Sequence, residues 1–516
     1  MKKIYSILLA ACSLVGISSC DSLDLLPEST ISDAGYWQTD DQFNAFHTGI
    51  ASCFRKYSWY YFAFGETRAS IYGDTPFGGE ATQGMEVLFN NTLTPTTAGI
   101  GNYGGLYYPI NQINLMIAKA EESTGLPEAE KSYYLGESYG LRAYLYFHLL
   151  RSYGDAIIYT DYTSGNSLDL SNLARKQDPA AQALARIKDD ITASEAAFNG
   201  NYAFTKGKNY WSLGATKMLK GEVYLWSGKQ MGGGAADYAT AKTALQEVNN
   251  CPGIALQDTY GDVFKFSNKK NSEIIFSIYN GENETELLDG SWNGNFMPQQ
   301  AYMNNGSRYN ENGEENSTTA DAQINGLIRM PLKRDIYQKL YRDEDSRKRV
   351  NLRGVFNKNE DGTLTYEAAY PYKYQGTMMA GSAKRSMYDD YPVYRYADCL
   401  LMLAEAKALL GEDIAEEINA VRKRAYGENY SEAVAYPNDK GDFYVDNEFV
   451  AGDEDPIEAI LKERLRELIF EGKRWYDIRL MDKAEKYSLA TSSKLLWPID
   501  EGTRTNNSLL EQTPGY

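Results

Sequence analysis

At 516 residues the chain is long enough to bury a large core, and 43% hydrophobic with 24% charged residues are the proportions of a folded body that sits in water. Seventy acidic residues against 52 basic ones give a net charge of −18, which disfavours nucleic acid and anionic membranes as partners. Only two histidines occur, so histidine-rich metal sites and most histidine-based catalysis are hard to build.

The N-terminus has the pattern of a secretory signal. Lys2 and Lys3 precede an apolar run at residues 4–17 that is too short to span a bilayer, and small residues follow it. We therefore predict a signal peptide at residues 1–19.

The end of this signal resembles a bacterial lipobox, because Ile-Ser-Ser precedes Cys20. Cys12 also fits the pattern locally, but cleavage there would leave a very short apolar core. Asp21 and Asp24 resemble the surface-export signals of Bacteroidetes lipoproteins. We predict lipidation of Cys20 and a tether at residues 20–34, which places the protein at the cell surface of the outer membrane.

Helical spacing of apolar residues recurs along the rest of the chain. An amphipathic helix is predicted from residue 40 through residue 50. Further helices are predicted at residues 107–122, 128–153, 179–198, 211–227, 236–249, 394–410, 413–426 and 456–481. Several carry small residues beside aromatic ones, which lets paired helices approach closely. The pattern resembles degenerate tetratricopeptide helix pairs with long insertions.

Two of these insertions, residues 58–105 and 280–320, lack helical periodicity and are rich in glycine, asparagine, tyrosine and tryptophan. Loops on a rigid scaffold are where binding residues tend to lie. A sugar ring has an apolar face and a hydroxyl rim, so its binder needs flat aromatic groups together with amide or charged groups. The candidate ligand-binding residues are Trp59, Tyr61, Arg68, Tyr72, Asp74, Trp292, Asn293, Phe296 and Tyr302.

We expect Trp292 to be the best single candidate, because its polar, glycine-rich setting disfavours deep burial. Many of these rings could instead fill the underside of the loops. We expect substitutions of Trp292 and Trp59 to distinguish ligand binding from core packing.

Three other patterns could indicate a metal site or a catalytic site, but each has a simpler structural interpretation. Residues 357–364 resemble the start of a calcium loop, but the position of the closing glutamate is Ala368, so we predict a hairpin there. His47 and His148 are interpreted as packing residues, since no partner for catalysis is visible. The carboxylates near Glu311 are interpreted as a solvated run rather than a glycosidase pair. We predict no catalytic residue, no metal and no cofactor.

Six segments in order resemble the SusD/RagB family. They are residues 20–27, 142–155, 391–406, 418–425, 463–477 and 497–516. The resemblance implies a mainly α fold with four tetratricopeptide-like helix pairs, long loops and a few short strands, in a single domain at residues 35–516. It also implies that the protein associates with a SusC-like TonB-dependent outer-membrane transporter and covers it as a lid. The charged residues of these segments are expected to tie helices together rather than to bind ligand.

The function that follows is capture of an oligosaccharide or polysaccharide at the cell surface for the transporter, without catalysis. A peptide-binding subunit on the same scaffold is the alternative, and a secreted glycan-degrading enzyme is a weaker one.

Overall fold

The computed structural model describes residues 35–163 and 174–516. The predicted signal peptide, the lipidation site Cys20 and the tether lie outside these residues. Within them the protein is mainly helical, and its strands form three small antiparallel sheets of two strands each. In the parts of the chain that are described, no helix is both long enough and apolar enough to cross a membrane.

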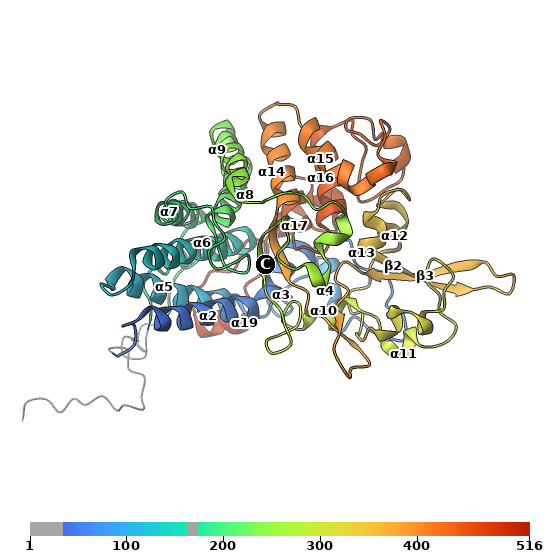
Figure 1. Ribbon diagram of the computed structural model, residues 1–516, viewed down its shortest axis with the longest axis horizontal. Helices are drawn as coiled ribbons and strands as arrows, with labels where there is room; N and C mark the ends of the chain where they lie inside the picture. Colours follow the sequence, from blue (N-terminus) through green and yellow to red (C-terminus); the bar gives the residue numbers. More distant parts are fainter. Residues whose placement is uncertain (1–34, 164–173) are drawn as a thin grey trace, which may run out of the picture.

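The first half of the chain forms a layer of long helices, on the left in Figure 1. Neighbours along this layer pack on one another: α2 on α5, α5 on α6, α6 on α7, and α8 on α9. Their bounds are α2 Asp40–Lys56, α5 Tyr107–Glu122, α6 Glu128–Tyr153, α7 Ala180–Phe198, α8 Leu213–Gln230 and α9 Gly234–Glu247. The predicted helices are confirmed here, and the bounds of α5 and α6 agree at both ends.

Small residues permit the close packing of this layer, as predicted. A Cβ atom at Gly140 of α6 would lie 2.1 Å from the indole nitrogen of Trp211, and one at Gly221 of α8 would lie 2.6 Å from Leu245 of α9. Because such distances are far below van der Waals contact, only glycine allows these helices to approach so closely.

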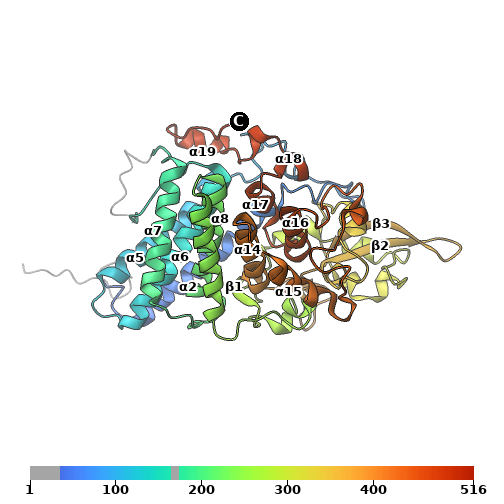
Figure 2. The ribbon, with the colours of Figure 1, turned by 90° about the horizontal axis from the view of Figure 1, so that it is seen from above.

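The second half forms a body beside this layer, seen at the centre and right of Figures 1 and 2. Helix α14 joins the two parts, because it packs on α8 and α9 and also on α15 and α16. The helices of this body are α10 Ser291–Phe296, α11 Gln300–Met303, α12 Arg334–Lys339, α13 Arg347–Asn351, α14 Tyr396–Leu409, α15 Ala415–Tyr426, α16 Pro456–Leu468, α17 Arg474–Leu480 and α18 Ala484–Tyr487. The last helix, α19 Glu501–Asn506, lies instead at the left of Figures 1 and 2, with the layer of the first half.

The three sheets are short. Strand β1 (Ile274–Ile278) pairs with β6 (Tyr391–Arg395), and β4 (Thr377–Met378) pairs with β5 (Arg385–Ser386). Strands β2 (Leu352–Lys358) and β3 (Leu364–Pro371) form the hairpin that projects at the right of Figure 1.

The predicted helix at residues 456–481 is wrong in one respect, because it is interrupted between α16 and α17. Phe470 and Gly472 have φ values of 70° and 72°, which end the α-helix. The break brings backbone to backbone: a Cβ atom at Gly65 would lie 1.7 Å from the carbonyl oxygen of Gly472. The interruption therefore seats this segment against the helix that contains Gly65.

That helix is α3, Ser58–Glu66, in a region predicted to be a loop. Its sequence is apolar on every side, so it has no amphipathic period to detect, and it is buried in the core. A second short helix, α4 at Glu86–Phe89, follows it. The expectation of an irregular segment throughout residues 58–105 is therefore wrong for these stretches.

Buried arginine–carboxylate pairs connect the second half internally. Arg395 donates to Glu273 at 2.8 Å and to Glu467 and Glu471 at 2.7 Å each, and all four side chains are buried. Charge-assisted hydrogen bonds of this kind stabilise the fold only when every partner is present, because an unpaired buried charge destabilises the folded state. Arg395 and Glu471 thus have the tying role that the sequence predicted.

Glu463 on α16 belongs to the same network. Its carboxylate accepts hydrogen bonds from Arg347 at 2.6 Å and from Arg422 at 2.8 Å. Burial acts to raise the pKa of Glu463, but the charges of these two arginines lower it to about 2. The carboxylate therefore stays ionised in the folded protein at neutral pH.

Candidate ligand-binding hollow

The two predicted binding regions come together at the lower edge of the molecule near α10 and α11 (Figure 1). The rings of Phe77 and Tyr302 have centroids 5.2 Å apart, and Gln299 donates a hydrogen bond to Glu80. Residues that are more than 200 positions apart in the sequence thus form one surface. That both regions contribute to one binding site stays a prediction.

An open depression of about 390 Å³ lies on this surface. We call it the amide hollow, because four carboxamide side chains line it. Its lining residues are Asn293, Gly294, Gln299, Gln300, Ala301, Asn325, Gly326 and Leu327. Its volume is in the range of small-molecule sites, which begin at roughly 300 Å³.

Backbone hydrogen bonds fix the shape of the hollow. Gly326 donates to the carbonyl of Pro298 at 2.8 Å, and Ile328 donates to Met297 at 2.9 Å. A Cβ atom at Gly326 would lie 2.2 Å from the carbonyl oxygens of both Asn293 and Met297. Only glycine allows this approach, so Gly326 lets residues 326–330 lie directly against α10.

The carboxamides of the hollow are positioned by their own contacts. The amide nitrogen of Asn293 donates to Glu286 at 3.0 Å, and that of Gln300 donates to the carbonyl of Ala322 at 3.0 Å. A carboxamide can donate two hydrogen bonds and accept two, which suits hydroxyl groups that also do both. The hollow is therefore equipped for a ligand rich in hydroxyl groups.

The expectation that Trp292 avoids deep burial is wrong. Its side chain is 0% exposed, with ring centroids 4.7 Å from Phe296 and 5.0 Å from Tyr374. The polar stretch folds into the short helix α10, and this helix turns the indole into the core. A ring without exposed surface cannot stack on a sugar, so Trp292 is a packing residue in this structure.

Three more candidate rings share this position. Phe296 and Tyr72 are 0% exposed and Tyr61 is 1% exposed. Tyr61 lies on α3 and donates its hydroxyl to the carbonyl of Phe54 at 3.1 Å. These three rings therefore fill the underside of the loops, which was the alternative to ligand binding.

Arg68 is also a structural residue. Its guanidinium is 0% exposed and donates to Asn91 at 2.8 Å and to the carbonyl of Leu496 at 2.7 Å. It lies over the ring of Trp475 at 4.5 Å. Burial lowers the pKa of Arg68 to about 10. Its role is to hold the C-terminal segment rather than a ligand.

Four candidates keep exposed surface. Trp59 and Tyr302 are half-buried, as is Asn293 in the hollow, and Asp74 is exposed. Asp74 accepts a hydrogen bond from the backbone nitrogen of Arg334 at 2.7 Å, which marks it as a loop-fixing residue. Tyr302 follows Ala301 of the hollow in the chain but does not line the hollow, and its ring packs under the guanidinium of Arg308 at 4.6 Å and against Phe77 at 5.2 Å.

Gln299, Gln300 and Asn325 were not among the predicted binding residues. The first two lie within the predicted loop, between the candidates Phe296 and Tyr302, and Asn325 lies beyond that loop. Asn325-Gly326 is a turn signal that could have been noticed. The search for rings therefore missed a site whose polar groups are amides.

The remaining patterns are placed as follows. Residues 359–363 form the turn of the β2–β3 hairpin, and Glu367 pairs with Arg308, so the predicted hairpin is confirmed. His47 is bonded to Glu137 inside the core, and His148 lies 3.1 Å from the hydroxyl of Tyr476. Burial lowers the pKa of His148.

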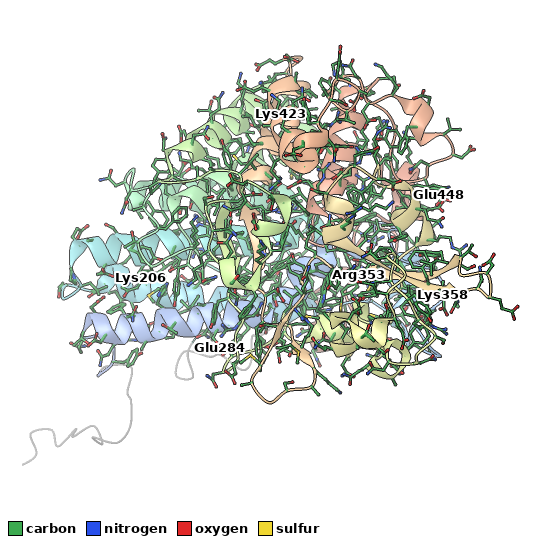
Figure 3. The ribbon with its side chains drawn as sticks, turned by 45° about the vertical axis from the view of Figure 1, so that its right-hand side comes forward. Lys206, Glu284, Arg353, Lys358, Lys423 and Glu448 are labelled. Carbon is green, nitrogen blue, oxygen red and sulfur yellow. The ribbon has the colours of Figure 1, made fainter. Side chains whose placement is uncertain are left out.

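The run of glutamates is only partly solvated. Glu311 forms an ion pair with Arg353 at 2.7 Å, at the base of the hairpin in Figure 3. Within the described residues, no group of three or more histidine, cysteine or acidic side chains is arranged to hold a metal ion.

Comparison with known proteins identifies the fold. The model of the SusD family matches residues 259–489. The structure of Bacteroides fragilis NanU superposes with a TM-score of 0.91, at 54% identity, and the match covers 95% of this chain and 100% of that one. A SusD superfamily protein from Bacteroides vulgatus gives a TM-score of 0.89 at 51% identity, over 93% of this chain and 100% of that one. The chain belongs to the SusD family.

Among curated relatives of this SusD-family chain, SusD-like protein P38 of Formosa agariphila is 27% identical over 563 residues, with 100% of each chain covered. The predicted mainly α, tetratricopeptide-like fold is confirmed by these structural matches. In this SusD-family member several charged residues of the family motifs, Arg395, Arg422, Glu463 and Glu471 among them, lie in the buried ionic network, and none of these lines the amide hollow.

Proposed function

We propose that the protein binds a glycan at the amide hollow. The observation that carries the proposal is an open hollow lined by four carboxamides, on the surface where the two loop regions meet. Amides match hydroxyl groups, because both can donate and accept hydrogen bonds. A laminarin-binding SusD-like protein shares this fold with a TM-score of 0.69 at 21% identity, which supports the fold as a frame for glycan binding.

The role is binding rather than catalysis. Both histidines are 3% exposed, and each is engaged with another side chain in the core. A general acid or base must reach the proton that it transfers, and these side chains are enclosed. The buried carboxylates of the second half are engaged with arginines in the same way.

We further propose that the protein is an outer-membrane lipoprotein at the cell surface, attached through Cys20, that passes glycan to a SusC-like TonB-dependent transporter. The lipobox-like sequence before Cys20 and membership of the SusD family support this proposal. Residues 35–516 are proposed to act as one domain in this role.

The decisive experiment is titration by calorimetry against a panel of neutral oligosaccharides, with the wild type beside Gln300→Ala and Asn325→Ala. We expect each variant to lose roughly fivefold to thirtyfold in affinity, because one or two hydrogen bonds at about 1 kcal/mol each are removed. Gln182→Ala, an exposed glutamine on α7, is the matched control and should bind like the wild type.

Two outcomes would refute the proposal. One is unchanged affinity in both hollow variants when their melting temperatures are also unchanged. The other is binding of a peptide library by a protein that binds no oligosaccharide of the panel, which would establish the peptide alternative.

A further inference from the structure

A second concave surface lies between α2 and the segment that follows β1. We call it the α2 cleft, and its volume is about 280 Å³. Its floor is apolar and consists of Phe54, Leu141, Phe276 and Ile278, all of them buried. None of these residues belongs to the amide hollow.

The rim of the cleft carries two aromatic rings. Tyr279 is 40% exposed, which is unusual for a large side chain in this protein, and Tyr210 is half-buried. Tyr210 is stacked on the ring of His47, with centroids 4.6 Å apart, so its orientation is fixed. An apolar floor under fixed, partly exposed tyrosines can accept the flat face of a ring.

The polar groups of the rim are held in place. Arg55 donates to the carbonyl of Tyr279 at 3.1 Å and also pairs with Glu284, which fixes this lip to α2. Figure 3 shows Glu284 at the lower edge of the body, near the end of α2. The exposed hydroxyl groups of Thr48 and Ser52 on α2 complete the opposite lip.

The charges of the cleft are balanced. Arg55 and Lys270 carry positive charge, and Glu137 and Glu284 carry negative charge. Because the signs cancel, long-range electrostatics give no preference for a charged ligand. Hydroxyl groups, amphipathic rings and an apolar floor fit a neutral sugar unit.

The cleft and the amide hollow share one connecting loop. Glu284 lies on the cleft, Glu286 binds Asn293 of the hollow, and only nine residues separate Glu284 from Asn293. Nine residues span at most about 32 Å even when fully extended. Along this segment the two sites are therefore at most about 32 Å apart, a distance that a long oligosaccharide can span.

We infer that the α2 cleft is a second subsite for a neutral sugar unit, so that a long glycan occupies the cleft and the amide hollow together. This inference rests on the proposed function of the hollow and extends it. Linking two sites converts the second contact into an intramolecular one, so a long chain gains affinity that a short chain lacks.

The test compares a hexasaccharide with a disaccharide of the same linkage, both chosen from the neutral panel that the wild type binds. Ser52→Trp fills the cleft from an exposed position without removing any core atom, and Tyr279→Ala removes the exposed ring. Ala236→Trp adds the same indole to an exposed site on α9 and is the control.

We expect both cleft variants to bind the hexasaccharide roughly tenfold or more weakly, as the loss of one stacking contact implies, and to lose most of its advantage over the disaccharide. The control should behave like the wild type. Wild-type hexasaccharide affinity in both cleft variants, together with its loss in Gln300→Ala, would overturn the inference and leave the hollow intact. A wild type that binds no member of the panel would instead overturn the function proposed for the hollow.

Discussion

Replacing Trp292 by alanine should destabilise the protein and leave its glycan affinity unchanged. The indole is 0% exposed and lies among Phe296, Tyr374, Phe62 and Phe470, with ring centroids 4.7–6.3 Å away. Truncation of a buried tryptophan to alanine costs about 3–5 kcal/mol, because the transfer energy of the ring and the cavity left behind both count.

The expected shift in melting temperature follows from the size of the protein. An unfolding entropy of about 2.1 cal/mol/K per residue gives roughly 1 kcal/mol/K for a chain of about 500 residues, so the loss corresponds to about 3–5 °C. Thermal unfolding followed by circular dichroism measures it, and titration with a bound oligosaccharide measures affinity below the transition.

Trp59→Ala provides the comparison, because this half-buried indole has less packing to lose. A Trp292→Ala protein with a wild-type melting temperature and strongly reduced glycan affinity would contradict the packing role, since it would show that the ring reaches the ligand.

Gly326→Ala should lower the free energy of unfolding by about 1–3 kcal/mol and weaken glycan binding, because its Cβ atom would overlap two carbonyl oxygens; Gly294→Ala, where a Cβ meets nothing within 4 Å, should be neutral in stability assays. Arg68→Ala should cost roughly 2–4 kcal/mol and release the C-terminal segment to limited proteolysis, whereas unchanged protection would refute that anchor. For the contributions of Glu463 and Glu66 together, urea unfolding should show a stability maximum near pH 4.5. The lowered pKa of Glu463 gives stability that is complete above its ordinary value of 4.5 and is lost as pH falls toward about 2. Burial raises the pKa of Glu66 to about 7, so its contribution is complete below 4.5 and is lost as pH rises from 4.5 through about 7, and Glu66→Gln should reduce that decline.

The helical frame could be predicted because its signals are local. Amphipathic spacing located α5 and α6 at both ends, and small residues such as Gly140 and Gly221 indicated close helix packing. Helix α3 escaped because a helix that is apolar on all sides carries no period. The break before α17 depends on contact with Gly65, about 400 residues earlier in the chain, and no local pattern reports it.

The site was harder to predict because composition does not fix orientation. Residues 291–296 look polar and flexible, yet as α10 they place Trp292 and Phe296 inward and Asn293 toward the hollow. Which side of a six-residue helix faces solvent depends on tertiary contacts. The amides of Gln300 and Asn325 come from separate segments, so only the folded chain brings them together.

The bond between Arg68 and the carbonyl of Lys494 joins residues 426 positions apart. A chain that emerges from a ribosome or a secretion channel in N-to-C order therefore presents this guanidinium long before its acceptors exist. Until the C-terminal segment is present, the guanidinium of Arg68 stays hydrated, and the neighbouring helix α3 cannot complete its packing. Contacts of such large sequence separation form late and slowly. The first helices should consequently complete their packing only after the last segment of the chain has been synthesised.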